Sequence, residues 1–79
     1  MIPDGAGQDL VRREAMRELE AAIHDARVAF DCIGLGELDR AHTSAVTARV
    51  AIDAAVTAVQ AALVQAGSAD GAGSLEADQ

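Results

Sequence analysis

Apolar residues recur at alternating intervals of three and four along two segments of this chain, and this spacing constrains the fold more than any other feature. In the first segment the pattern runs through Met16, Leu19, Ile23, Ala26, Phe30 and Ile33. In the second segment it runs through Leu38, Ala41, Ala45, Ala48, Ile52, Ala55, Val59, Ala62 and Ala66. Such spacing places one stripe of each α-helix against a partner helix, as in left-handed coiled coils. The sequence therefore predicts an all-α protein.

Local signals at the ends of the two patterns predict the helix boundaries. Asp9 is a candidate N-cap, so we expect a first helix over about residues 9–33. Gly34 fits the left-handed position that closes many helices. A second helix is expected over about residues 37–66, with acidic residues in its first turn, where the helix dipole favours them.

The short glycine-containing connection predicts an antiparallel two-helix hairpin, because three residues cannot carry the chain to the far end of the first helix. We divide the chain into a flexible leader (1–8), a helical hairpin domain (9–66) and a disordered acidic tail (67–79). Folding the chain about Leu35 places Phe30 opposite Ala41 and Ile23 opposite Ala48, so that large side chains meet small ones.

The second helix carries another stripe of small and β-branched residues on the side away from the first. A helix that is apolar on two sides is normally covered on both, and a hairpin this small usually needs a partner to be stable. We therefore expect a homodimeric four-helix bundle. Its predicted intersubunit interface consists of Thr47, Val50, Ala54, Thr57, Ala61 and Val64.

The net charge of −7 argues against nucleic acid or an acidic membrane surface as a partner. The expected partner is another protein, most simply a second copy of the chain. We expect a cytoplasmic location, since no secretory leader is visible and a single cysteine forms no internal disulfide. In the first helix, Asp9 with Arg13 and Glu14 with Arg17 have helical pairing distances.

The sequence offers little catalytic chemistry, and we expect neither an enzyme nor a cofactor. Glu20 with His24, and Asp39 with His42, have spacings that place metal-ligand types on one helix face, but the two pairs lie at different heights in the predicted hairpin. Cys32 is expected off the interhelical stripe and partly buried, with no positive residue in its turn of the helix.

These features predict a non-catalytic interaction or structural protein that homo-oligomerises through its second helix. One alternative is a small acidic regulator or adaptor, antitoxin-like, that binds a dissimilar protein. Another is a metal-binding helical bundle.

Overall fold

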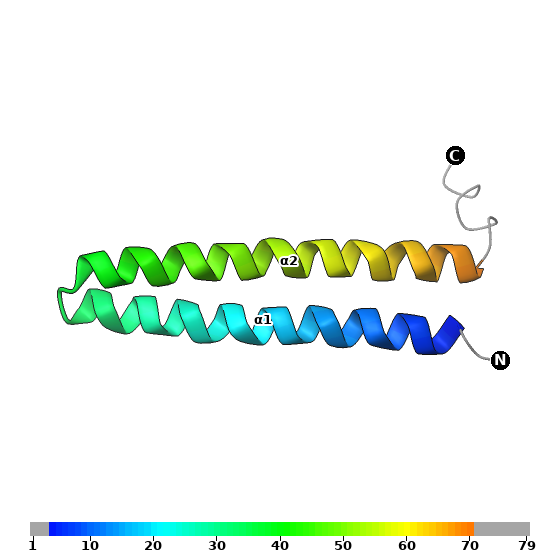
Figure 1. Cartoon of the computed structure of the whole chain (residues 1–79), viewed down its shortest axis with the longest axis horizontal. Coiled ribbons are helices and arrows are strands. Elements are labelled where there is room, and N and C mark those ends of the chain that lie inside the picture. The colour runs from blue at the N-terminus through cyan, green and yellow to red at the C-terminus, as the bar shows by residue number, and fades with distance from the viewer. Residues whose placement is uncertain (1–3, 71–79) are drawn as a thin grey trace.

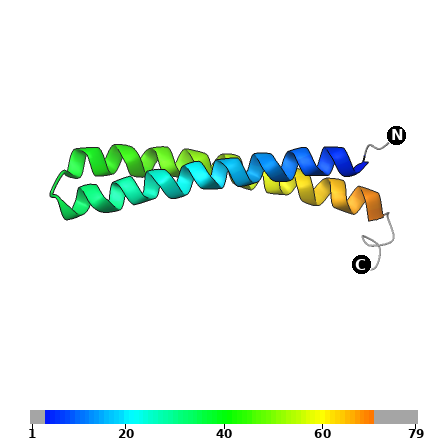
Figure 2. The ribbon, with the colours of Figure 1, turned by 90° about the horizontal axis from the view of Figure 1, so that it is seen from below.

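The predicted helical hairpin is confirmed by a computed structural model, which describes the backbone of residues 4–70 and the side chains of residues 9–67. Helix α1 spans Asp4–Gly34 and helix α2 spans Leu38–Asp70. The two helices run antiparallel along their whole length (Figure 1) and cross at a shallow angle near their middle (Figure 2). At 1.5 Å per residue, each helix is roughly 45–50 Å long.

Both helices extend beyond the predicted boundaries. Helix α1 begins at Asp4 rather than at Asp9, so residues 4–8 of the predicted leader are helical. Helix α2 continues to Asp70, so the first residues of the predicted tail are helical too. Residues 1–3 and 71–79 lie outside the described residues.

The end of α1 is closed by a hydrogen-bond pattern in which Gly36, and not Gly34, is the left-handed residue. The backbone N–H of Glu37 donates to the carbonyl of Cys32 at 2.8 Å, and that of Gly36 donates to the carbonyl of Ile33 at 3.0 Å. This pair of bonds defines a Schellman motif, whose C′ position requires a positive φ. Gly36 occupies that position with φ of 80°, so the sequence-based assignment of this role to Gly34 was wrong.

Glu37 both ends the connection and caps the start of α2. Its carbonyl accepts the first hydrogen bond of the helix, from the N–H of Ala41 at 3.0 Å, while its carboxylate accepts a bond from Arg40 at 3.0 Å. Asp39 lies in the first turn, so negative charge stands at the positive end of the helix dipole as expected.

The interior between the two helices consists almost entirely of alanine. Among the residues whose side chains are described, the buried ones are Ala15, Ala22, Ala29, Cys32, Ala41, Ala48, Ala51, Ala55 and Ala58. Three of these on each helix are spaced by seven: residues 15, 22 and 29 on α1, and residues 41, 48 and 55 on α2. A repeat of seven keeps the same side of a helix toward its partner, so this alanine stripe defines the interhelical core.

The large apolar residues predicted to form this core on α1 lie outside it. Met16, Ile23 and Phe30 are exposed, and each follows directly after a buried alanine. The predicted stripe on α2 is correct at Ala41, Ala48 and Ala55, but Leu38, Ala45, Ile52 and Val59 are exposed. The interhelical stripe of α1 was therefore assigned one residue too far along the chain.

Side-chain size explains why the alanine stripe faces inward. A methyl group lets two helix backbones approach more closely than a leucine or phenylalanine does, and close approach gives dense contact along the whole length. Counting outward from the connection, Ala29 comes level with Ser44, and Ala15 with Ala58. The bulky side chains are then directed to the surface of the hairpin.

Candidate interaction surface

One broad face of the hairpin carries most of its large apolar side chains. Two antiparallel helices are related by a local two-fold axis perpendicular to the plane that contains them. In both helices, the residue that follows a core position therefore points to the same face of the hairpin. We call this surface the apolar face. It consists of Met16, Leu19, Ile23, Phe30 and Ile33 on α1, and Leu38, Ile52, Val56, Val59 and Leu63 on α2.

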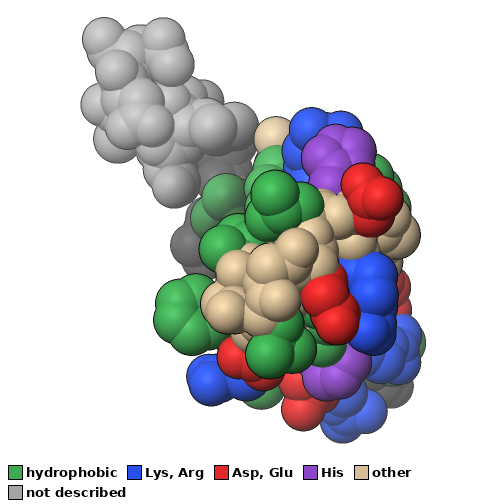
Figure 3. All heavy atoms as spheres, turned by 90° about the vertical axis from the view of Figure 1, so that its left-hand side faces the viewer, with side chains coloured by type: hydrophobic (Ala, Val, Ile, Leu, Met, Phe, Trp, Pro, Cys, Tyr) green, Lys and Arg blue, Asp and Glu red, His purple; other side chains and the backbone are tan. Residues whose placement is uncertain are grey.

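These side chains are well exposed in the single chain. Phe30 is 75% exposed and Met16 is 70% exposed, while the least exposed member, Leu19, is still at 40%. Seen end-on from the connection, hydrophobic side chains gather on one side of the molecule, and most charged side chains lie on the other side and at the edges (Figure 3). The hairpin thus exposes its larger apolar residues and buries its smaller ones.

The apolar face carries few charges for so acidic a protein. Between Met16 and Ile33 on α1, and between Leu38 and Leu63 on α2, the positions that follow core residues include no carboxylate. The polar side chains on this part of the face are His42 and Arg49. Of the Asp and Glu side chains between these limits, Glu18 and Asp25 are half-buried at positions of the interhelical stripe, and the others lie at the edges or on the opposite face.

The predicted interface on α2 lies on that opposite face, which we call the threonine face. Its six residues are Thr47, Val50, Ala54, Thr57, Ala61 and Val64; Ala54 is half-buried and the others are exposed. None of the six belongs to the interhelical core, and their burial by another chain stays a prediction.

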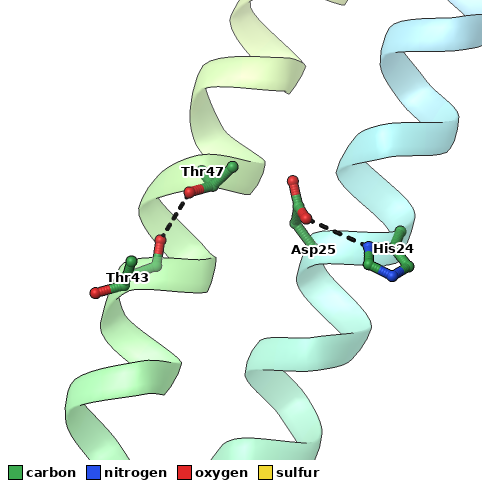
Figure 4. A network of polar contacts seen from close by, with 4 residues as sticks. All are labelled: His24, Asp25, Thr43 and Thr47. Carbon is green, nitrogen blue, oxygen red and sulfur yellow. Dashed lines mark hydrogen bonds and ion pairs between the residues drawn. The ribbon is translucent and has the colours of Figure 1, made fainter.

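Threonine hydroxyls on this face are satisfied within α2 itself. Thr47 donates to the carbonyl of Thr43 at 3.0 Å, and Thr57 donates to that of Asp53 at 3.2 Å. On α1, Asp25 projects between the helices toward Thr47, and His24 lies beyond Asp25 on the side away from α2 (Figure 4). The α1 half of the threonine face is therefore partly polar.

A shallow apolar groove lies between the helices on the threonine face, toward the open end of the hairpin. It is lined by Leu10, Val11 and Glu14 of α1 and by Ala54, Thr57, Ala58 and Ala61 of α2. Small side chains on α2 leave this space open. The groove shows no convergence of polar groups of the kind that fixes a small-molecule ligand.

The candidate metal ligands do not converge in the part of the chain that the structure describes. His24 Nδ1 lies 3.4 Å from Asp25 Oδ1, and no group of three or more His, Cys, Asp or Glu residues is arranged to hold a metal ion among the described residues. Cys32 is a free thiol, and it is buried in the interhelical core next to the connection rather than off the core as predicted.

Helix α2 also contains a segment, Leu38–Gly67, that by length and composition alone is long and apolar enough to cross a membrane. Core helices of soluble proteins meet the same criterion but are mostly buried, whereas 17% of the apolar window in this helix is buried in the hairpin.

Comparison of the chain with protein-family models, with curated protein sequences and with solved structures finds no match.

Proposed function

We propose that this protein is a non-catalytic helical interaction protein that self-associates into a dimeric four-helix bundle and acts through that assembly. The observation that supports this proposal is that the hairpin buries small apolar side chains and exposes large ones. The hairpin buries alanines and one cysteine, whereas the ten large side chains of the apolar face remain exposed.

As a consequence, a single hairpin gains little free energy from burying its apolar side chains. Burying one methyl-sized group contributes about 0.8 kcal/mol, whereas burying a large aliphatic or aromatic side chain contributes about 1.5–3 kcal/mol. Small domains without a disulfide or metal usually need further burial to offset the conformational entropy lost on folding. Covering the apolar face with protein would supply that burial.

Sedimentation equilibrium combined with circular dichroism tests this function. At micromolar concentration the full chain should have a mass of twice 8.1 kDa, and dilution should lower mass and helicity together because folding is coupled to association. A fully helical monomer that unfolds cooperatively at the same concentration would contradict self-association.

A second candidate function is that of a small acidic regulator that binds a dissimilar, basic protein. The charge of −7 favours it, because an acidic surface attracts a basic partner and speeds their encounter. Under this alternative the isolated chain is a poorly helical monomer at every concentration, so the same sedimentation and dichroism series separates the two functions.

A further inference from the structure

We infer that the apolar face is where a second copy of this chain docks, face to face, about a two-fold axis lying in the plane of that face. This inference rests on the proposed self-association and adds to it the surface that is buried. The threonine face, predicted from the sequence as the interface, then remains in contact with solvent.

The area of the apolar face matches what a stable dimer needs. An aromatic side chain has about 150–250 Å² of surface and an aliphatic one has less, so these ten side chains, which are 40–75% exposed, present on the order of 800 Å² per chain. Stable protein interfaces bury about 800 Å² per partner, whereas the largest apolar patch on a monomeric protein is usually about 300–600 Å². The face is therefore larger than a monomer normally leaves uncovered.

Large apolar side chains line the face over most of its length. They occur on α1 from Met16 to Ile33 and on α2 toward the open end from Ile52 to Leu63. The stretch of α2 from His42 to Arg49 carries smaller or polar side chains on this face. The face is therefore a long apolar strip that involves both helices.

A two-fold axis in the plane of the face lets both copies use the same apolar patch. Such an interface is isologous and closes at two chains.

The charge distribution permits two acidic chains to meet on this side. Because the central apolar face has no carboxylate, docking there desolvates no acidic group. His42 and Arg49 stand on the α2 edge of the face, where long side chains can keep their polar ends in water. Docking through the threonine face would instead bring Glu14 and Asp31 of each copy toward the partner, together with Arg17, which pairs with Glu14.

A pair of matched neutral substitutions tests the inference. Ile23 on the apolar face is 62% exposed in the hairpin and Val50 on the threonine face is 61% exposed, so each can be changed to glutamine with a similar loss of apolar surface and no change in charge. An amide forced into an apolar interface costs free energy on both sides of a two-fold interface. In sedimentation of the full chain, Ile23→Gln should raise the dimer dissociation constant at least tenfold, and Val50→Gln should change it less than threefold.

A measurement on the unmodified chain guards against a variant that merely fails to fold. Peroxide oxidises Met16 on the apolar face, and we expect the rate, followed by mass spectrometry of the peptide, to fall at least fivefold as the chain passes from monomer to dimer, with free methionine as the reference. A dimer in which Met16 stays as reactive as in the monomer, or in which Val50→Gln is the disruptive variant, overturns the inference while leaving self-association intact.

A different occupant of the face would give different results. A helical wild-type monomer would contradict both the inference and the proposed function. A poorly helical monomer that becomes helical on phosphatidylcholine vesicles would assign the apolar face to a lipid surface, and a monomer that stays poorly helical would assign it to a dissimilar protein; either result overturns docking of a second copy.

Discussion

At the scale of single residues, the fold depends on how little space each core side chain occupies. Ala22 and Ala55 are each only 3% exposed, and neither has a side chain beyond Cβ. Where two backbones approach closely over many turns, any added atom must displace a helix or adopt a strained rotamer. The interhelical core should therefore tolerate enlargement poorly.

The substitution Ala22→Leu tests this core. We expect it to lower the free energy of unfolding by roughly 1–3 kcal/mol, because the added atoms overpack the contact between the helices. Urea denaturation followed by circular dichroism measures the change. The control is Ala21→Leu at the adjacent exposed position, which should change the stability by less than about 0.5 kcal/mol; an equal loss at both positions would mean that the core is misplaced.

Gly36 provides a second test at this scale. Its φ of 80° lies in the left-handed region, so Gly36→Ala should destabilise the hairpin by about 1–2 kcal/mol. Gly34 is the last residue of α1, and a methyl group added at its Cα would meet open space, so Gly34→Ala should be neutral or slightly stabilising. Thermal unfolding of the two variants decides between them: a larger loss at Gly34 would reverse the assignment of the Schellman motif.

At the scale of the helices, the sequence was enough to predict two antiparallel helices and their connection. It was not enough to predict which stripe of α1 packs against α2. Periodicity shows that one side of α1 is apolar, and both Ala22 and Ile23 fit a repeat of seven. Assigning the larger residue to the interhelical stripe is correct when the two helices form the whole core of a protein. In this hairpin the visible signal was the repeat of alanine at 15, 22 and 29, matched at 41, 48 and 55.

Ion pairs along α1 add little to the stability of the helix. Arg17 pairs with Glu14 as predicted, whereas Asp9 pairs with Arg12 at 2.9 Å rather than with Arg13. All of these side chains are substantially exposed, and exposed pairs contribute about 0–1 kcal/mol.

We therefore expect Arg17→Gln to change the stability by less than about 0.5 kcal/mol, measured by urea denaturation at low salt. Glutamine keeps the helix propensity of the position and removes only the charge. A loss above about 1.5 kcal/mol would show that the pair contributes to packing as well as to surface charge.

At the scale of the whole molecule, the excess of apolar surface was predictable and its location was not. The sequence showed that α2 has more apolar residues than one partner helix can cover. The larger apolar face can be identified only when the position of the alanine stripe is known. Moving the core by one residue moves Met16, Ile23 and Phe30 from the interior to the surface. The predicted interface at Val50 and Thr57 likewise depends on which residues form the interhelical core.

Association of two such chains should respond to salt in a particular direction. Each copy carries −7, so a dimer carries −14 and its halves repel at long range. Raising the ionic strength from about 0.01 M to about 0.15 M shortens the Debye length from about 30 Å to about 8 Å and should tighten the dimer. Sedimentation in a sodium chloride series measures this; a dimer weakened by salt would indicate attractive ion pairs across the interface.

The most direct test uses Phe30, the one aromatic residue in the sequence. Replacing it biosynthetically with 4-fluorophenylalanine gives a single ¹⁹F resonance whose shift between H₂O and D₂O reports contact with solvent. We predict a solvent-exposed signal in dilute protein that is replaced, as concentration rises, by a second signal with little solvent shift. A folded dimer whose fluorine stays fully sensitive to solvent would contradict the claim that the apolar face is covered by a second chain.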